Sequence, residues 1–279
     1  MQHYGLIGWQ IAHSMSPKLQ TQAFAQAHVV ANYALYDINP EVFNTEISGV
    51  LSQLAGANVT TPYKQAIMAE LDDVTPLAQK TQSVNTVFRD GQGHLIGDTT
   101  DGQGFWLALQ YQIGILTGQR VLLIGCGGAA RAIMAAKPAE TTLVVANRPS
   151  DHFDAYATVT ESLLEQPLYD LTAIDDQLQE MDVIVDATTV GMHDNQTILS
   201  DAQMQVTQAH VNIVDLKYNH ANTPLMRLAQ SEQRNNFNGL AMLVGQGCLS
   251  QQRWTGYQPD LLTLMNEMGV AQNDNHNNA

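Results

Sequence analysis

Short apolar runs alternate with amphipathic stretches from one end of this chain to the other. Four of the runs, QRVLLI, TTLVVA, DVIVDA and VNIVDL, have the continuous apolar character of strands that are buried on both faces of a sheet. They recur at a spacing that leaves room for a helix between consecutive strands. Strands that alternate with helices imply a parallel sheet, so the pattern predicts an α/β fold.

Residues that favour turns and helix ends set the bounds of the expected elements. Ser16-Pro17 marks a helix start, since serine caps helices and proline fits the first helical position. Asp90-Gly91 lies between two strand-like segments and predicts a hairpin, and Pro138 should end a short helix near Ala136. Strands are expected over 4–8, 32–38, 57–60, 84–89, 94–97, 119–124, 141–146, 182–187 and 211–216, and helices from 16 toward 28, over 41–54, from Pro62 and over 102–111.

The length of the chain predicts two domains. Its 279 residues correspond to about two units of roughly 150 residues each, and Asp101-Gly102 is the expected boundary. Hydrophobic residues make up 44% of the chain, which is enough for a full core, and two cysteines are too few for a disulfide scaffold. Cys126 and Cys248 are therefore expected to be inert small residues in a reducing, cytoplasmic setting.

Charge and hydropathy exclude two classes of partner. With 12 Lys and Arg against 27 Asp and Glu, the formal net charge is −15, which argues against a general nucleic-acid binder. A local site can still bind one small anion against that field. No apolar stretch approaches the roughly 20 residues of a membrane helix, and the N-terminus lacks the basic region of a signal peptide. The expected partner is a small molecule.

A glycine-rich segment, GCGGAAR, directly follows QRVLLI and fits the pattern G-x-G-x-x-A with Gly125, Gly127 and Ala130. Gly125 allows a tight turn, Gly127 lets the backbone approach a pyrophosphate, and Ala130 keeps the helix close to the strand. The N–H groups at the helix N-terminus would bind the phosphates. The position between an expected strand and an expected helix predicts dinucleotide binding.

The end of the next expected strand bears on which dinucleotide is bound. Asn147-Arg148 lies about 20 residues after the glycine loop, where folds that bind NAD usually place Asp or Glu on the ribose 2′-hydroxyl. An arginine instead suits a 2′-phosphate, which favours NADP.

Two polar groups near the N-terminus suggest a site for a small anion. Ser14 and Ser16 place two hydroxyls at a helix N-terminus, where they either cap the helix or bind a carboxylate together with the helix dipole. Asn58 and Thr60 share one face of a strand, and Lys64 follows in the first turn of the expected helix. A lysine there is either solvated or held by a carboxylate.

The carboxylate that could hold Lys64 is Asp101, which otherwise would be a plain cap for the next helix. These motifs occur together with others in one order along nearly the whole chain: IAHSMSP, GANVTTPYK, SVNTVF, GDTTDGQGF, LLIGCGGAAR, ANR, DLKYN and NGLAMLVGQG. In this respect the sequence resembles the shikimate dehydrogenase family, whose members are NADP-dependent enzymes of aromatic amino-acid biosynthesis.

The resemblance implies a fold, an activity and a set of site residues. The implied fold has two α/β domains with the active site in the cleft between them: 1–101, completed by 239–279, binds substrate, and 102–238 is a Rossmann-like NADP-binding domain. The implied reaction is the reversible reduction of 3-dehydroshikimate to shikimate, by a monomer or homodimer, with Lys64 and Asp101 as the catalytic pair. The implied substrate contacts are Ser14, Ser16, Asn58, Thr60, Lys64, Asn85, Asp101, Tyr218 and Gln246. The implied cofactor contacts are Gly125, Gly127, Gly128, Ala129, Ala130, Asn147, Arg148, Thr188, Leu216 and Gly239.

Some residues depart from the family pattern and leave alternatives open. Asp186 stands where asparagine is common, and Asp151 follows Arg148 where a second basic residue is frequent. Asp151 could reach a ribose hydroxyl, so an NAD-dependent quinate/shikimate dehydrogenase is the nearest alternative. A second alternative, a folate methylene dehydrogenase, does not account for Ser14 and Ser16 as a site for a carboxylate. A third alternative is a nucleotide-sensing protein without turnover, but such a protein needs no proton donor such as Lys64. No Cys/His ligand cluster is present, so no metal is expected.

Overall fold

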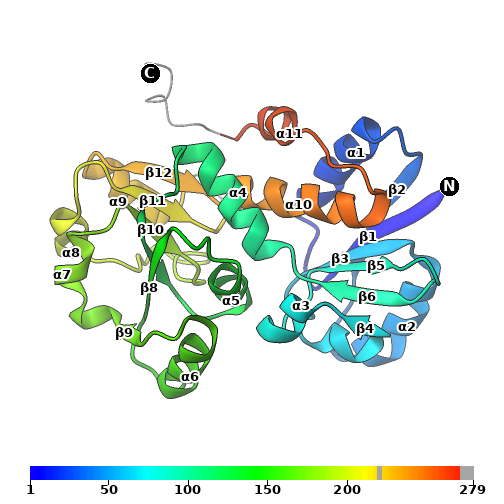
Figure 1. The fold of residues 1–279 in the computed structure, drawn as a ribbon, viewed down its shortest axis with the longest axis horizontal. Helices are drawn as coiled ribbons and strands as arrows, with labels where there is room; N and C mark the ends of the chain where they lie inside the picture. Colours follow the sequence, from blue (N-terminus) through cyan, green and yellow to red (C-terminus); the bar gives the residue numbers. More distant parts are fainter. Residues whose placement is uncertain (219–221, 271–279) are drawn as a thin grey trace. The chain divides into compact units, whose positions relative to one another are not determined.

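The structure is a computed structural model that describes residues 1–218 and 222–270 (Figure 1). The chain forms two compact units. Unit 1 contains Met1–Gly104 and Leu243–Gly269, and unit 2 contains Phe105–Met242 together with Val270. Both boundaries fall within the first turns of helices, α4 (Asp101–Ile113) and α10 (Leu240–Thr255), and so lie slightly beyond Asp101-Gly102 and Gly239.

Unit 1 is built on a mixed six-stranded sheet in the order β2-β1-β3-β5-β6-β4. Strand β1 runs parallel to β2 and β3, whereas β5 is antiparallel to both β3 and β6. The hairpin predicted at Asp90-Gly91 joins β5 to β6 and is confirmed. The strands are β1 Gln2–Gly8, β2 Ala31–Asp37, β3 Gly56–Val59, β4 Asp73–Val74, β5 Thr86–Arg89 and β6 Leu95–Asp98.

Helices cover both faces of this sheet, because alternate strand residues point to opposite sides. On β1, Ile7 packs into a core with α2, while Tyr4 and Leu6 pack into a second core with Phe24 of α1. Trp254 of α10 joins the second core and donates from its indole N–H to the Val87 carbonyl at 2.9 Å. The helices are α1 Ser16–Gln26, α2 Phe43–Gln53, η1 Ala66–Glu70, α3 Pro76–Thr81, α10 Leu240–Thr255 and α11 Leu261–Met268.

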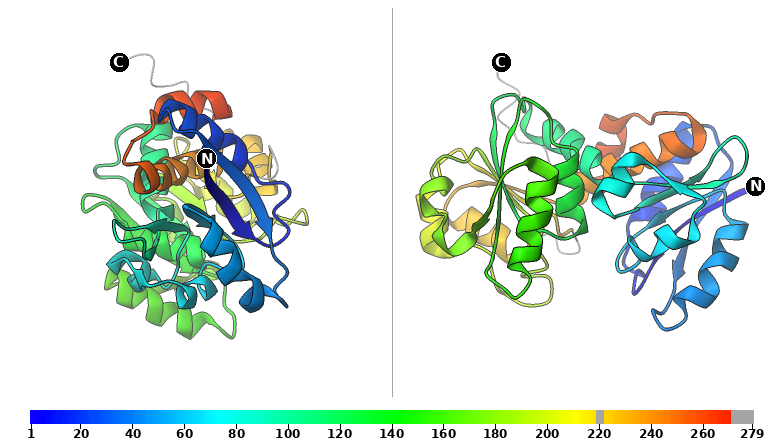
Figure 2. Two further views of the ribbon diagram at one scale, coloured as in Figure 1. Left: turned by 90° about the vertical axis from the view of Figure 1, so that its right-hand side faces the viewer. Right: turned by 60° about the horizontal axis from the view of Figure 1, so that its bottom comes forward.

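The C-terminal helices complete unit 1 by packing on its first helix. Figure 2 shows α11 beside α1, and Lys18 donates to the Glu267 carbonyl at 3.3 Å. The amide of Asp260 donates to the side chain of Gln26 at 2.8 Å. The last part of the sequence therefore packs on the same side of the sheet as α1.

Two local predictions in unit 1 are wrong. Ser16 does not cap α1: it is the first helical residue, and its amide donates to the Ser14 hydroxyl at 3.2 Å. The helix expected from Pro62 is replaced by a turn, in which the amide of Tyr63 donates to the Thr60 carbonyl, and by the short 3-10 helix η1. The Lys64 carbonyl accepts from the amide of Val84 at 2.8 Å, so it is not available to the amide of a following helical turn.

Unit 2 is a doubly wound parallel sheet in the order β12-β11-β10-β7-β8-β9. In chain order this is the arrangement of dinucleotide-binding folds, and it confirms the Rossmann-like expectation. The strands are β7 Arg120–Ile124, β8 Thr142–Asn147, β9 Leu168–Asp170, β10 Val183–Asp186, β11 Asn212–Asp215 and β12 Asn235–Asn238. The helices are α4 Asp101–Ile113, α5 Gly128–Ala135, α6 Phe153–Leu164, α7 Asp175–Leu178, α8 Asp201–Val206 and α9 Pro224–Ser231, with η2 at Leu171–Ala173.

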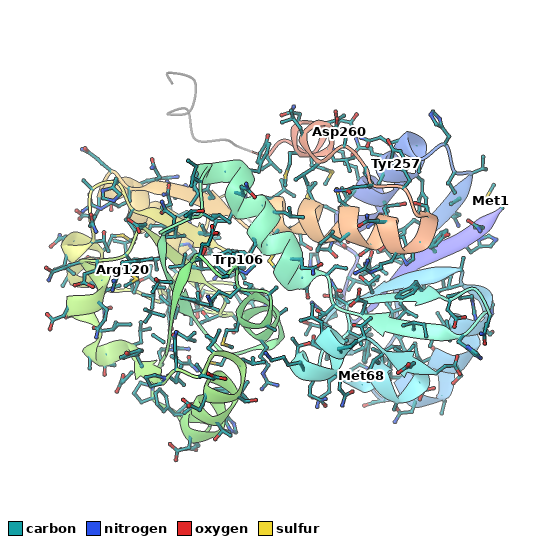
Figure 3. All side chains as sticks on the ribbon, in the orientation of Figure 1. Met1, Met68, Trp106, Arg120, Tyr257 and Asp260 are labelled. Atoms are coloured by element: carbon teal, nitrogen blue, oxygen red, sulfur yellow. The ribbon has the colours of Figure 1, made fainter. Side chains whose placement is uncertain are left out.

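Two cores flank the sheet of unit 2. One contains residues of α4, α5 and α6, and the other contains residues of α7, α8 and α9. Trp106 lies in the first core and donates to the Ile133 carbonyl at 3.0 Å, which ties α4 to α5 (Figure 3). Within residues 1–218 and 222–270, no helix has the length and apolar character needed to cross a bilayer.

Candidate active site

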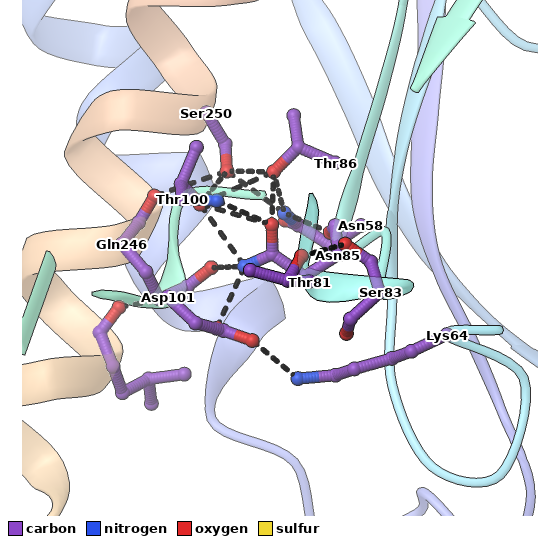
Figure 4. Close-up of polar contacts among 11 residues, drawn as sticks. Asn58, Lys64, Thr81, Ser83, Asn85, Thr86, Thr100, Asp101, Gln246 and Ser250 are labelled. Atoms are coloured by element: carbon purple, nitrogen blue, oxygen red, sulfur yellow. Dashed lines mark hydrogen bonds and ion pairs between the residues drawn. The ribbon is translucent and has the colours of Figure 1, made fainter. Parts of the chain in front are cut away.

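A partly buried ion pair lies at the carboxyl ends of β3 and β6 in unit 1. Lys64 Nζ lies 2.6 Å from Asp101 Oδ2, and the side chains of Lys64 and Asp101 are 23% and 7% exposed (Figure 4). Asp101 is the first residue of α4, and Lys64 follows the turn after β3. The partner predicted for Lys64 is confirmed, although its place in a helical turn is not. The remaining exposure leaves the ammonium accessible to a small molecule.

The backbone around Lys64 is anchored by the aromatic residue that precedes it. Tyr63 stacks on Phe43 with ring centroids 4.0 Å apart, and its hydroxyl donates to the Ile38 carbonyl. Burial, with a smaller contribution from Asp37, raises the pKa of the Tyr63 phenol. The phenol is therefore a neutral anchor, and the Lys64 main chain next to it has little freedom.

Asn85 holds the other oxygen of Asp101. Its Nδ2 donates to Asp101 Oδ1 at 2.7 Å, while its Oδ1 accepts from the amide of Thr100 at 2.8 Å. The Thr86 hydroxyl lies 3.0 Å from the same Oδ1 and donates to it. A flipped amide would turn its NH₂ toward the Thr100 N–H, so this orientation is fixed. Asp101 is therefore held by one donor on each carboxylate oxygen.

A network of hydrogen bonds between buried side chains lies next to Asn85. The hydroxyls of Thr86 and Ser250 are 2.8 Å apart, and Asn58 Nδ2 donates to Ser250 Oγ at 2.9 Å (Figure 4). Asn58 Oδ1 accepts from the hydroxyl of Tyr33 at 2.8 Å and from Gln20 at 3.3 Å. Both ends of the Asn58 amide are thus engaged inside the protein, and all of these side chains are buried.

Glycines allow α10 to bring its polar residues to this cluster. A Cβ on Gly104 of α4 would lie 2.3 Å from the Gln246 amide nitrogen, and one on Gly245 would lie 2.3 Å from the Gly104 carbonyl oxygen. Any side chain at either position would push the two helices apart. At this separation Gln246 Oε1 lies 3.3 Å from Asn85 Nδ2, and Ser250 reaches Thr86 one helical turn later.

In unit 2, the expected cofactor contacts all lie at one edge of the sheet. Because the strands are parallel, their carboxyl ends meet at the same edge. The expected contacts follow or end five of these strands: Gly125, Gly127, Gly128, Ala129 and Ala130 after β7, Asn147 and Arg148 at β8, Thr188 after β10, Leu216 after β11 and Gly239 after β12.

The glycine loop has the geometry that a dinucleotide needs. Gly125 has φ of +114°, which side chains rarely adopt, and a Cβ there would lie 3.1 Å from the Thr188 methyl group. Around Gly127 a Cβ would meet nothing within 4 Å, so a ligand can approach the backbone. α5 begins at Gly128, and the N–H groups of its first turn have no partner within the helix. A phosphate therefore fits at this end of α5.

Arg148 presents an exposed side chain at the end of β8. It lines a cavity of about 360 Å³ together with residues that follow β9 and β10. The other lining residues are Leu171, Thr172, Asp175, Ile198, Ser200, Ala202 and Gln203. Asp151 is also exposed, three positions along the chain from Arg148. The positive charge expected beside a 2′-phosphate is therefore available to a ligand.

No group of three or more His, Cys, Asp and Glu side chains suited to a metal ion occurs in the part of the chain that the structure describes.

Comparisons with known proteins agree with the two-unit arrangement. The family model for the shikimate dehydrogenase substrate binding domain matches residues 6–87. The NADP(+) shikimate dehydrogenase of Geobacillus kaustophilus is 35% identical over 263 residues, covering 92% of this chain and 94% of that protein.

The chain belongs to the shikimate dehydrogenase family. Its relatives include the NADP(+) enzyme of Methanocaldococcus jannaschii, 31% identical over 94% of both chains. Among solved structures, a shikimate dehydrogenase in complex with NADP+ matches with a TM-score of 0.84 at 30% identity, covering 98% of this chain and 96% of that one. The Thermus thermophilus enzyme in complex with NADP(H) and shikimate matches with 0.83 at 30% identity, over 96% of this chain and 99% of the other.

The structure joins only some of the substrate contacts that resemblance to shikimate dehydrogenases implied. Lys64, Asp101, Asn85 and Gln246 form one cluster, and Asn58 is connected to it through Ser250. Among the described residues, no side-chain hydrogen bond links Ser14, Ser16 or Thr60 to this cluster. Tyr218 lies in unit 2 shortly after β11. The roles of these residues in binding substrate stay predictions.

Sequence reasoning missed Thr86, Thr100 and Ser250, which orient the Asn85 amide or support its partners. A signal was present: Thr86 and Thr100 lie within the motifs SVNTVF and GDTTDG, and Ser250 lies four positions after Gln246 on one helical face. It also missed Lys217 of the DLKYN motif, whose side chain is buried in unit 2.

Proposed function

We propose that this protein is an NADP-dependent shikimate dehydrogenase that reduces 3-dehydroshikimate reversibly to shikimate. Its curated relatives carry that activity in their names, at 31–35% identity over more than nine tenths of the chain. The observation within the chain that supports the proposal most strongly is the contact of Lys64 Nζ with Asp101 Oδ2 at 2.6 Å. In the proposal, Lys64 is the proton donor and Asp101 the carboxylate that orients it, and the 23% exposure of the Lys64 side chain supports access by a substrate.

Lys64 acts as the proton donor in the proposed reaction. NADPH, held by the residues at the carboxyl edge of unit 2, would supply a hydride to the carbonyl carbon, and negative charge would then grow on the carbonyl oxygen. The Lys64 ammonium gives that oxygen a proton, and in the reverse direction the neutral amine takes the hydroxyl proton back. One ketone, one hydride and one proton become one alcohol, and no further reactant is needed.

Asp101 is proposed to orient Lys64 and to stabilise its charged form. The carboxylate cannot rotate freely, because Asn85 donates to Oδ1 while Lys64 donates to Oδ2. Asn85 is in turn held by Thr86 and Thr100. Fixed geometry of this kind places the ammonium before substrate arrives, which lowers the reorganisation needed during proton transfer.

Ser14 and Ser16 are proposed to bind the carboxylate of the substrate. They lie at the N-terminus of α1, an eleven-residue helix whose dipole favours an anion there. Ser14 Oγ accepts from the amide of Ser16, which leaves its hydroxyl hydrogen for a ligand. Thr60, Tyr218 and Gln246 are proposed to complete the contacts with the substrate.

The carboxyl edge of unit 2 is proposed to hold NADP. The pyrophosphate fits the Gly125–Ala130 loop, and Arg148 can donate two hydrogen bonds to the 2′-phosphate. Thr188, Leu216 and Gly239 would border the other end of the dinucleotide. A Cβ on Gly239 would lie 2.0 Å from the Leu216 carbonyl oxygen, so only glycine allows this close approach.

The test is an absorbance assay at 340 nm with purified protein. Shikimate-dependent reduction of NADP+, with little reduction of NAD+, supports the proposal. Equal or better use of NAD+, or oxidation of quinate at a similar rate, would favour the quinate/shikimate alternative. Nucleotide binding without turnover would favour a sensor, and turnover only with a methylene folate would assign the chain to that other class.

A further inference from the structure

A buried lysine that the proposed reaction does not use lies at the carboxyl edge of unit 2. The side chain of Lys217 is 5% exposed, and its Nζ lies 2.7 Å from Asp186 Oδ2 and 2.8 Å from Asp215 Oδ1. It also donates to the Thr188 carbonyl at 3.3 Å. The ammonium thus donates hydrogen bonds to Asp186 and to the Thr188 carbonyl, and it forms an ion pair with Asp215, so that the three side chains form a triad.

The two carboxylates of the triad are also fully engaged. Asp186 Oδ1 accepts from the amide of Thr188 at 2.8 Å, and Asp215 Oδ2 accepts from the Thr223 hydroxyl at 2.6 Å. Asp215 Oδ1 accepts in addition from the amide of Lys217 at 3.0 Å. The triad therefore connects the carboxyl ends of β10 and β11 to the start of α9.

A purely structural role does not explain why this triad carries charges. The ladder between β10 and β11 already pairs Asp186 with Asp215, and the Leu216 amide donates to the Asp186 carbonyl at 3.0 Å. Apolar residues of similar volume usually stabilise a buried position at least as well as an ion pair does. Thr188, however, lies beyond the ladder, and the triad holds its backbone. Asp186 accepts a hydrogen bond from the Thr188 amide, and Lys217 donates one to the Thr188 carbonyl.

Thr188 connects the triad to the cofactor loop. Its methyl group lies 3.1 Å from the position that a Cβ would take on Gly125. The position of Thr188 therefore helps to define the space next to the first glycine of the loop. We propose that Lys217 is a positioning residue for the cofactor site, holding the Thr188 backbone in the arrangement that binds the dinucleotide. This inference rests on the proposed function, because it takes NADP as the ligand of that edge.

The departure of Asp186 from the more common asparagine has a physical account here. Burial raises the pKa of the Asp186 carboxyl, and the ammonium of Lys217 opposes that effect. Asp186 depends on Lys217, since without the ammonium it would be a buried carboxylate beside Asp215 with no opposing charge. Removing both together leaves the net charge of the triad unchanged at −1, with Asp215 ionised.

The experiment uses that balance. Lys217→Met/Asp186→Asn keeps the stem volume of Lys217, the acceptor for the Thr188 amide and the net charge, and removes only the ammonium bonds. Lys217→Arg keeps the charge but replaces a compact ammonium with a planar fork. Lys137→Met is the matched control, because Lys137 donates to the Pro138 and Thr141 carbonyls just before β8, at the opposite edge of the sheet.

Four quantities are measured for each variant: the melting temperature without ligand, the Kd of NADP+ by calorimetry, KM for NADP+ and KM for shikimate. We expect both Lys217 variants to raise Kd and KM for NADP+ by about five- to tenfold, with KM for shikimate unchanged and Lys137→Met like wild type. A folded Lys217 variant of either kind that binds NADP+ within twofold of wild type overturns the proposal.

A structural role alone would lower the melting temperature and leave the Kd of NADP+ unchanged. Lys217→Arg keeps the comparison possible if the double variant does not fold. A wild-type protein that binds NADP+ but does not oxidise shikimate would reject the proposed reaction and leave the binding comparison valid. A wild-type protein that binds no NADP+ would reject both.

Discussion

Asn85 donates from Nδ2 to Asp101 Oδ1 at 2.7 Å, and this contact couples the sheet of unit 1 to the first turn of α4. Asn85 precedes β5, and Asp101 begins the helix that follows β6, so the hairpin between them brings the two side chains together. The opposite carboxylate oxygen is then directed to Lys64. Proton transfer by Lys64 is thus expected to depend on the orientation that Asn85 gives to Asp101.

The first prediction concerns Lys64. Lys64→Ala should lower kcat by about 10²–10⁴-fold, because it removes the proposed proton donor. KM for shikimate should change far less. Steady-state kinetics in both directions measure this, and Lys80→Ala, at the end of the short helix α3, is the control. A Lys64→Ala enzyme that retains more than half of the wild-type kcat would remove Lys64 from the chemistry.

The second prediction concerns the orientation of Asn85. Thr86→Val preserves the shape of the side chain but removes the hydroxyl that donates to Asn85 Oδ1. A hydrogen bond of this kind contributes about 1 kcal/mol, so kcat/KM should fall by roughly fivefold, with a small loss of stability. Thr86→Ser keeps the hydroxyl and should recover most of the activity. Equal kinetics for the two variants would show that the hydroxyl does not position Asn85.

The third prediction concerns the carboxylate of the substrate. Ser14→Ala and Ser16→Ala should raise KM for shikimate with a smaller change in kcat, because their proposed contact is remote from the reacting carbon. Since Ser14 also accepts from the Ser16 amide, Ser14→Ala should have the larger effect. An analogue without the carboxylate that reacts as well as shikimate would rule out a carboxylate site at α1.

The fourth prediction concerns the choice of cofactor. Arg148→Ala should lower kcat/KM for NADP+ and leave the value for NAD+ nearly unchanged, because only the 2′-phosphate offers a partner to the guanidinium. Asp151→Asn should act in the opposite direction, since it removes an exposed negative charge from the same loop. A parallel loss of both efficiencies in Arg148→Ala would show that Arg148 does not bind the phosphate.

The fifth prediction concerns the thiols. Burial raises the pKa of Cys248 to about 12, with a smaller contribution from Asp260, and burial also raises the pKa of Cys126. The thiolate is the reactive form, so at pH 8 neither cysteine should react with a disulfide reagent until the protein unfolds. The ordinary pKa of a cysteine thiol is 9.0, so below pH 9 the Cys248 contribution to stability is complete. As the pH rises from 9 toward 12 that contribution is lost, because the unfolded chain ionises this thiol and the folded protein does not. Rapid labelling of native protein at pH 8 would contradict this.

Several features follow from the sequence alone because they depend on neighbouring residues. The continuous apolar runs of β7, β8, β10 and β11 identify a buried parallel sheet, since only strands covered on both faces lack polar positions. The cofactor contacts expected of the glycine loop and of Arg148 follow from their positions directly after β7 and β8. Asp90-Gly91 indicated the hairpin, although its loop spans residues 90–94 and the glycine with positive φ in that loop is Gly93.

Features that depend on distant residues were decided by the tertiary structure. The segment after Pro62 is a turn because the Lys64 carbonyl pairs with Val84, a contact that local helix signals cannot anticipate. Ser250 joins Thr86 only because α10 returns to unit 1 and crosses α4 at two glycines. Lys217 looks like a surface residue within DLKYN until folding brings Asp186, 31 residues earlier in the chain, to its ammonium. In each case the deciding partner lies far along the chain, and only packing places it within hydrogen-bond distance.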